Sequence, residues 1–412
     1  MKQSVNPETL LVALDIGTTK ICVLVAQITS TDSFELIGIG KSPSDGLEKG
    51  VVVDVAKTVH SIKNAIKEAE LMAGCTIQQA TIGISGAHIQ SRNSIGMVPI
   101  NRGEIRNYDI IQATTAARAV ALPEGQQILH VLPQFFVIDS HEKVIDPLGM
   151  FGVRLEAHVH IITGAVASVH NLVKCCESAG ITVNDIVLEQ LASADAVLTA
   201  DEKLLGVGML DIGGGTSDLA IYHKGTIRHT MVLPIAGNHF TKDIAIGLRT
   251  TIQSAEAIKK EYGIVDQKLL GEDTCIELTC ISKQDTQLIL QSELLGILRP
   301  RAQELFEFIN KECKKHSLYH FMPSGFVLTG GGALLKGMQT LATNIFNIPV
   351  RIGIPQTQST FSQFLQNPMY ATGYGLLLHA LKKQDTTSIN RLTGPLASRI
   401  IGRMKSWVSD FF

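Results

Sequence analysis

Apolar residues along the chain alternate between the two-residue period of strands and the three-to-four-residue period of helices. Helical periods cover 55–73, which a glycine follows, and 168–180. Strand patterns occur at 10–26, 34–40, 80–84, 157–163 and 181–189. Because strands and helices alternate in this way, the chain is predicted to have an α/β fold.

One strand-turn-strand pattern occurs twice. ALDIGTTKICVLVA at 13–26 and MLDIGGGTSDLAIY at 209–222 share an apolar strand, an aspartate and a glycine-rich turn. The two copies are separated by far more than the about 20–50 residues of a solenoid repeat. The repeat therefore indicates a duplicated domain. The second copy opens a run of predicted β-hairpins at 207–235, and a third glycine cluster, FVLTGGGALLKG at 326–337, stands between a predicted strand and a predicted helix.

Two stretches interrupt the regular alternation and divide the chain into subdomains. Residues 85–162 and 239–308 mix turns, short strands and helices, so each half is predicted to carry an insertion. The predicted division is a first core subdomain at 1–84 and 163–190, its insertion at 85–162, a second core subdomain at 191–238 and 309–382, its small subdomain at 239–308, a flexible linker at 383–398 and an amphipathic helix at 399–412.

Length and composition fit a protein of at least two globular units. The chain has 412 residues, more than the roughly 250–300 at which a single core stops growing. Its 36 Lys and Arg nearly balance 38 Asp and Glu, and no long basic run occurs, which argues against a nucleic-acid-binding protein. The seven cysteines form no C-x-x-C pair, as expected of a reduced, cytosolic protein. No signal peptide and no membrane-spanning segment are predicted.

The doubled turn has the chemistry of a polyphosphate clamp. Glycines let backbone N–H groups approach an anion closely, and Thr18, Thr19 and Thr216 add hydroxyl donors. Asp15 and Asp211 carry the same sign of charge as phosphate, so their expected role is to hold the water shell of a divalent cation such as Mg²⁺. A single turn of this kind is usually only a tight hairpin. Two of them, together with the third glycine cluster, favour a nucleotide site.

Four motifs stand in the order found in the actin-like ATPase superfamily. ALDIGTTK, MLDIGGGTSD, LTGGGALLKG and MYATGYGLLLHAL resemble its phosphate-1, phosphate-2, adenosine and second connecting motifs. Within the superfamily, the segments at 44–70 and 146–164 and the amphipathic C-terminus are similar to the FtsA family of bacterial cell-division proteins. The resemblance covers essentially the whole chain. It implies an α/β actin-like fold of two duplicated ribonuclease-H-like domains, with an inserted subdomain in each and a C-terminal amphipathic helix.

The resemblance also implies which residues bind ATP and Mg²⁺. Asp15 and Asp211 would lie near the metal and contact it through water. The phosphates would be contacted from one side by Gly17, Thr18, Thr19 and Lys20, and from the other by Gly213, Gly214, Gly215 and Thr216. The nucleoside would be contacted by Glu256, Lys259, Gly330, Gly331 and Gly332. The alternative for Glu256 and Lys259 is a solvated pair on a helix face.

A hydrolytic residue is less clearly defined by the sequence. The resemblance places a Gln or Glu on the helix that enters the second half, where Glu189 and Gln190 stand. Glu189 is the candidate catalytic residue, and the alternative is a helix-start residue beside the positive end of the helix dipole. ATP binding is therefore expected, with weak or absent hydrolysis. His158 and His160 share a strand face and are interpreted as polar side chains rather than a metal pair, because no third ligand is visible.

The C-terminus is predicted to bind a membrane surface. After the polar linker, apolar side chains recur at helical spacing on one face, with Arg399, Arg403 and Lys405 on the other. Such a segment is too short and too charged to span a bilayer, but it suits the interface of an anionic membrane. The residues expected at the membrane are Ile400, Ile401, Arg403, Met404, Trp407, Val408 and Phe411.

The resemblance to FtsA implies an ATP-binding, self-assembling adaptor. It would tether FtsZ polymers to the cytoplasmic face of the inner membrane at the division septum, assemble head to tail, and recruit other divisome membrane proteins. The C-terminal peptide of FtsZ would bind at Arg299 and Arg301, which flank a proline interpreted as a helix start. The alternative is that Arg301 only covers a helix face. A sugar-kinase-like phosphotransferase, which shares the doubled turns, is the alternative function.

Overall fold

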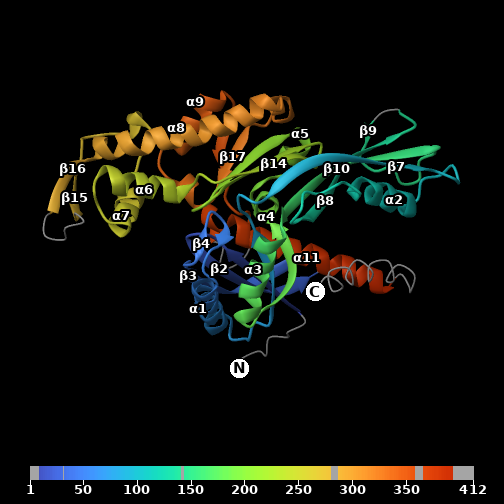
Figure 1. Ribbon diagram of the computed structural model, residues 1–412, viewed down its shortest axis with the longest axis horizontal. Coiled ribbons are helices and arrows are strands. Elements are labelled where there is room, and N and C mark those ends of the chain that lie inside the picture. The colour runs from blue at the N-terminus through green and yellow to red at the C-terminus, as the bar shows by residue number, and fades with distance from the viewer. Residues whose placement is uncertain (1–8, 31, 141–142, 280–285, 358–364, 393–412) are drawn as a thin grey trace.

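The first half of the chain is built on a five-stranded sheet. The computed structural model describes residues 9–30, 32–140, 143–279, 286–357 and 365–392 (Figure 1). In this sheet, β1 runs antiparallel to β2 and parallel to β6. The strand order is β11-β6-β1-β2-β3, with β1 (Leu10–Ile16), β2 (Lys20–Ser30), β3 (Ser33–Pro43), β6 (Gln79–Ile84) and β11 (Thr182–Leu188). A small hairpin of β4 (Leu47–Glu48) and β5 (Val51–Val52) follows β3.

The second half repeats this arrangement. Its β12 runs antiparallel to β13 and parallel to β17, as β1 does to β2 and β6. The order is β14-β13-β12-β17-β18, with β12 (Val207–Ile212), β13 (Ser217–His223), β14 (Thr226–Leu233), β17 (Phe326–Thr329) and β18 (Val350–Ile352). The predicted duplication is therefore confirmed at the level of strand topology.

Helices cover the sheets and join the two halves. The predicted helix at 55–73 is confirmed as α1 (Val55–Ala73), which Asp54 caps at its start and Gly74 ends in the left-handed conformation. Side chains of α4 (Glu189–Val197) and α11 (Ala371–Leu392) share one buried cluster with Leu24 of the first sheet and Met209 of the second. This shared core holds the halves together. In the described part of the cores, the other α-helices are α3 (Val166–Ser178), α5 (Ala200–Leu205) and α9 (Met338–Phe346).

A separate antiparallel sheet projects from the first half. This inserted sheet has the order β7-β10-β8-β9, with β7 (Gln90–Pro99), β8 (Gln126–Ile138), β9 (Lys143–Val144) and β10 (Arg154–Ala165). Helix α2 (Asn107–Arg118) packs on one of its faces (Figure 1). His158 and His160 belong to β10 but have different surroundings: His158 stacks on Phe135, whereas His160 is buried between Asn93 and Thr230. The interpretation of both as polar side chains of the strand agrees with these contacts.

Buried His160 predicts a loss of stability in acid. Burial lowers the pKa of His160 from its ordinary value of 6.5 to about 3. The unfolded chain protonates this histidine below pH 6.5, whereas the folded chain does so only near pH 3. The free energy of unfolding therefore keeps its full value above pH 6.5 and decreases as the pH falls from 6.5 toward 3. We expect a loss of about 2 kcal/mol between pH 7 and pH 5. Urea unfolding of the protein and of His160→Gln, which cannot titrate, measures it. Equal pH dependence in the two proteins would contradict the assignment.

The second insertion is mainly helical. It contains α6 (Gly237–Gly247), α7 (Ile252–Tyr262), the hairpin β15 (Cys275–Thr279) and β16 (Thr286–Leu290), and the long α8 (Gln291–Lys315). In Figure 1 these elements gather at the end of the molecule opposite the inserted sheet. The two insertions therefore lie at opposite ends of the long axis.

The structure corrects the predicted linker. Residues 383–392, expected to be flexible, continue α11. Where this part of the helix begins, Lys382 and Lys383 form ion pairs with Asp195 and Asp185. A polar composition alone does not end a helix, and residues 383–393 contain no Gly or Pro. Residues 393–398 and the predicted membrane helix at 399–412 lie outside the described residues. Within the described part of the chain, no helix has the length and apolar character needed to cross a membrane.

Candidate functional site

The two copies of the repeated motif form the same turn. The first turn (residues 17–19) joins β1 to β2, and the Gly17 N–H donates to the carbonyl of Lys20 over 3.1 Å. The second turn (residues 213–216) joins β12 to β13, and the Gly213 N–H donates to the carbonyl of Thr216 over 2.9 Å. The shared sequence pattern thus specifies a shared hydrogen bond.

The first and second turns touch each other. A Cβ atom built on Gly214 would lie 1.8 Å from Thr19 Oγ1, and one built on Gly215 would lie 2.3 Å from Thr18 Oγ1. Neither separation is possible for a real side chain, so only glycine allows this contact. Residues almost two hundred positions apart are therefore brought together, one from each half, as the repeat predicts. Figure 1 shows the two sheets meeting in this central region.

Four carboxyl groups surround the contact between the turns. Asp15, Asp211 and Asp218 are 8%, 7% and 3% exposed, and Glu189 is half-buried. Burial raises the pKa of Asp15 to about 6 and that of Asp218 to about 7, and it raises the pKa values of Asp211 and Glu189 as well. Asp211 adds to the shift at Asp15, Asp218 and Glu189, and Lys20 partly opposes it at Asp15. The charged forms of these carboxyl groups are therefore disfavoured in the absence of a cation.

Hydroxyl groups fix the position of Asp211. Its Oδ2 accepts hydrogen bonds from Ser193 Oγ at 2.5 Å and Thr372 Oγ1 at 3.2 Å. These donors come from α4 and α11, the two helices packed between the sheets. The carboxylate is thus oriented by both helices of the shared core, which keeps it rigid beside the second turn.

Lys20 lies at the site but is held by the chain itself. Its Nζ donates to the carbonyl of Met369 over 2.8 Å and lies 4.7 Å from the centre of the Tyr370 ring. A contact of Lys20 with phosphate, as the family resemblance implies, would exchange the Met369 carbonyl for a phosphate oxygen. The contact of Lys20 with the phosphates therefore stays a prediction.

The third glycine cluster packs directly beside the second turn. A Cβ on Gly330 would lie 2.2 Å from Asp211 Oδ1, and one on Gly332 would lie 2.3 Å from Ile212 Cγ2. At Gly331, in contrast, no heavy atom of the described residues beyond its own chain neighbours lies within 4 Å of the Cβ position. The cluster opens a short 3₁₀ turn rather than a long helix, because α9 begins only at Met338. Gly331 therefore presents backbone that a flat ring can approach.

Glu256 and Lys259 form a partly buried pair that reaches the second turn. Lys259 Nζ lies 2.6 Å from Glu256 Oε2 and donates to the carbonyl of Gly237, whose N–H donates to the carbonyl of Gly213. Thr241 Oγ1 donates to the same Glu256 oxygen. With its side chain 14% exposed, Lys259 is not the solvated partner considered as the alternative. The pair belongs to the neighbourhood of the second turn.

Glu189 begins α4 beside Asp15, Asp211 and Asp218. A Cβ on Gly83 would lie 3.1 Å from Glu189 Cγ, so the side chain rests on the end of β6. Its neighbour Gln190 is fully buried, and neither of its amide atoms has a hydrogen-bond partner among the described residues. Glu189 thus has a position near the turns, and its catalytic role stays a prediction.

Sequence reasoning missed several residues of this site. Asp218 stands directly opposite Asp211 in the β12–β13 hairpin, a pairing that follows from the four-residue turn between them. Counting residues outward from the turn would have been sufficient to predict Asp218 opposite Asp211. Ser193, Thr372 and Gly237, in contrast, come from distant segments with no pattern of their own, and only the folded chain brings them to the turns.

The structure corrects the local setting of Arg299 and Arg301. They were expected at a helix start, but Pro300 lies inside α8, which begins at Gln291. Apolar residues on both sides of the proline, such as Leu298 and Ala302, are buried in one core, and this packing outweighs the preference of proline for the first turn. The Arg301 guanidinium is already paired with Asp243, at 2.6 Å, and with Glu304. Arg299 has no ion pair with the described residues.

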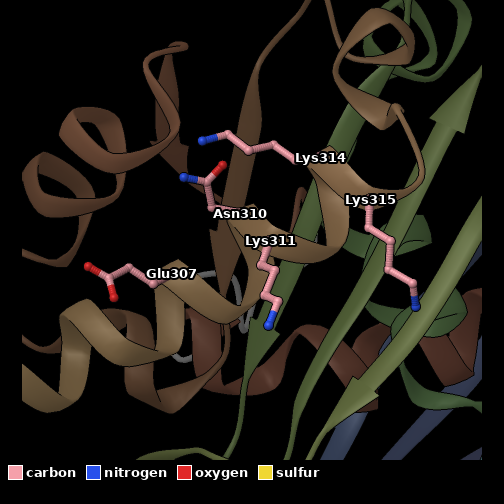
Figure 2. Close-up of a pocket in the computed structure, with 5 residues that line it drawn as sticks. All are labelled: Glu307, Asn310, Lys311, Lys314 and Lys315. Carbon is pink, nitrogen blue, oxygen red and sulfur yellow. The ribbon is translucent and has the colours of Figure 1, made fainter.

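A shallow hollow on α8 contains none of the predicted site residues. It has a volume of about 500 Å³ and is lined by Glu307, Asn310, Lys311, Lys314 and Lys315. Figure 2 shows the three lysine side chains pointing in different directions rather than toward a common centre. Lysines in the last turns of a helix stabilise its negative end. The hollow is therefore explained by the end of α8 and needs no ligand.

Comparisons with known proteins decide the family. Two sequence models match the chain: "Cell division protein FtsA" over residues 208–375 and "SHS2 domain inserted in FTSA" over residues 86–163. The chain is 45% identical over 415 aligned residues to the cell division protein FtsA of Pseudomonas aeruginosa, covering 99% of this chain and 100% of the relative. The chain belongs to the FtsA family. The FtsA proteins of Escherichia coli K12 and Bacillus subtilis are 36% and 38% identical, over 98% and 92% of this chain and 98% and 84% of theirs.

Solved structures support the fold. A protein of the PilM-PilN type IV pilus biogenesis complex superposes with a TM-score of 0.66 at 18% identity, covering 90% of this chain and 98% of that one. MreB5 of Spiroplasma citri bound to ADP gives 0.56 at 18% identity, covering 94% and 100%. These likenesses and the SHS2 match to the inserted sheet and α2 confirm the predicted actin-like α/β fold. Membership of a cell-division family also removes the phosphotransferase alternative.

Proposed function

We propose that this FtsA-family protein binds Mg-ATP between the first and second turns. The observation that carries the proposal is the direct contact of two glycine-rich turns from different halves, lined by threonine hydroxyls and backbone N–H groups. Such surfaces suit phosphate oxygens. Because Thr18 and Thr19 rest on Gly215 and Gly214, the turns must separate when a polyphosphate enters. The structures of MreB5 bound to ADP and to AMPPNP support a nucleotide at this fold.

Magnesium fits the donor set at the turns. Burial raises the pKa values of Asp15, Asp211 and Asp218, and repulsion by Asp211 adds to the shift at Asp15 and Asp218. A divalent cation would supply the missing positive charge. Among the described residues, no three side chains of Asp, Glu, His or Cys are placed to ligate a metal directly. We expect Asp15 and Asp211 to hold the ion through water, because Mg²⁺ usually keeps several waters.

Calorimetric titration with ATP tests the nucleotide proposal. We expect binding in Mg²⁺ and an affinity at least about tenfold lower in EDTA, because the carboxylates then repel the phosphates without compensation. Absence of binding in Mg²⁺ would overturn the proposal. Equal ATP affinity with and without Mg²⁺ would support ATP binding but contradict a role for the ion in it.

In cell division, we infer, the protein acts as a membrane tether. It would attach FtsZ polymers to the cytoplasmic face of the inner membrane at the septum, assemble head to tail, and recruit other divisome membrane proteins. The predicted amphipathic segment at 399–412 supports contact with an anionic membrane. One such helix binds weakly, so attachment would depend on many copies in one polymer.

The FtsZ C-terminal peptide is expected to bind near Arg299 rather than through Arg301. Arg299 is free of ion pairs with the described residues, whereas Asp243 and Glu304 occupy the Arg301 guanidinium. We expect Arg299→Glu to weaken binding of an acidic FtsZ tail peptide about tenfold. Lys311→Glu, more than three turns along the same helix, is the matched control and should bind normally. Fluorescence anisotropy of the labelled peptide measures both.

A second comparison keeps the roles of the two arginines apart. Arg301→Glu places a third carboxylate beside Asp243 and Glu304, so it should lower the melting temperature as well as any peptide affinity. Arg299→Glu should leave the melting temperature unchanged. Unaltered peptide affinity in Arg299→Glu would show that the site lies elsewhere.

A further inference from the structure

The inserted sheet is covalently part of the first half but is hydrogen-bonded to the second. The chain leaves the first sheet at the end of β6 and returns along β10 into α3. The closest polar contacts of the inserted region with the two halves, however, are those with β13 and β14 of the second sheet. Figure 1 shows β14 passing beside the base of β10. The inserted sheet thus bridges the two halves whose turns would hold the nucleotide.

One bridging contact lies at the second turn itself. Ser85, the residue after β6, donates from Oγ to Asp218 Oδ1 at 2.5 Å and lies 3.3 Å from Thr216 Oγ1. Ser85 and Asp218 are both buried. The root of the inserted sheet is therefore attached to the strand and the threonine that close the second turn.

A second bridging contact lies farther along the sheet. His160 Nδ1 is 2.8 Å from Asn93 Oδ1, and His160 Nε2 is 2.8 Å from Thr230 Oγ1 of β14. Because the Asn93 oxygen can only accept, Nδ1 carries the proton and Nε2 accepts from the Thr230 hydroxyl. Ser91 Oγ also donates to the Thr230 carbonyl at 2.8 Å. Thr230 is thus held by two residues of the inserted sheet.

The inserted sheet is tied to the first half as well. The Leu188 N–H at the end of β11 donates to His130 Nε2 of β8 over 3.1 Å. If the first and second turns separate around a polyphosphate, the contacts to the two halves cannot all be kept. The side with the larger set of hydrogen bonds is β13 and β14. Those of Ser85, His160 and Gln134, which donates to the Ile227 carbonyl, are buried, and that of Ser91 is partly buried.

We propose that the inserted sheet moves with the second half, through Ser85–Asp218 and His160–Thr230, so that nucleotide binding at the turns reorients it relative to the first half. This inference rests on the proposed binding of nucleotide between the turns. It makes Asp218 and Thr230 positioning residues that couple the site to a distant subdomain. The Leu188 amide, which bonds across to His130, is then the contact that opens.

Residue-resolved hydrogen exchange of the full chain tests the coupling. In wild type, Mg-ATP should accelerate exchange of the Leu188 amide about tenfold. Thr230→Val, which removes the hydroxyl held by His160, should bind ATP normally in calorimetry and lose the acceleration. Thr226→Val is the matched control. Among the described residues its hydroxyl donates to the His223 carbonyl on the neighbouring strand and not to the inserted sheet, so this variant should respond like wild type. Ser91→Ala, a milder change, should reduce the response if Thr230→Val does not fold.

The outcomes separate this inference from the proposed function. ATP binding with no change at Leu188 in wild type would overturn the coupling alone. A full response in Thr230→Val or in Ser91→Ala would also overturn it, because the signal would then travel by another route. Failure of wild type to bind ATP in calorimetry would overturn the proposed function and, with it, the coupling.

Discussion

Asp211→Asn should weaken Mg-ATP binding about 30–100-fold, the effect of losing a charged hydrogen-bonding partner worth about 2–3 kcal/mol. The carboxylate sits between the second turn and the third glycine cluster, and two hydroxyls fix its direction. Asparagine keeps an oxygen for Ser193 and Thr372 but cannot hold the water shell of a cation. Calorimetry in Mg²⁺ measures the loss.

The same substitution should leave the nucleotide-free fold intact. Burial raises the pKa of Asp211, so its charge is unfavourable without a cation, and a neutral side chain is expected to raise the melting temperature slightly. Asp201→Asn, at an exposed position of α5, is the control and should change neither quantity. Normal Mg-ATP affinity in Asp211→Asn would show that the nucleotide is not held at the second turn.

Trp407→Glu should release the protein from anionic vesicles. The substitution places a charge in the middle of the predicted apolar face at 399–412, whose burial in the interface supplies the binding energy. Because each copy binds weakly and a polymer multiplies the attachment, we expect the bound fraction to fall about tenfold or more. Sedimentation with vesicles that contain anionic lipid measures it.

Two controls make the membrane prediction specific. Trp407→Glu should bind Mg-ATP as wild type does, because the residue lies far along the chain from both turns. A chain that ends at Ser398 should behave like Trp407→Glu. If either protein still sediments fully with the vesicles, the membrane contact lies in another part of the molecule.

The repeated turn was predictable because its determinants are local. A short strand, an aspartate and glycines specify a hairpin, and two copies in one chain indicate two halves that face each other. The same local logic extended to register would have found Asp218 opposite Asp211. The contacts of Ser85 and His160 with the second half were not predictable, since their partners are 133 and 70 residues away and no sequence pattern links the two members of either pair.

Errors in the sequence predictions arose where composition competed with packing. Pro300 suggested a helix start, yet a buried stripe that runs from Leu294 to Ile309 carries α8 through it. The polar residues after Leu381 suggested a linker, yet they continue a helix anchored by Lys382 and Lys383. In both places, contacts with distant segments decided the structure, and a single sequence does not contain them explicitly.

Recruitment of FtsZ to anionic vesicles in the presence of Mg-ATP tests the central claim most directly. The measurement compares the full chain with the chain ending at Ser398 and follows FtsZ in the vesicle pellet, with and without nucleotide. The account predicts that FtsZ sediments only with the full chain, and more strongly with Mg-ATP than without. Equal recruitment by the shortened chain, or none by the full chain, would contradict the proposal that this protein tethers FtsZ to the membrane.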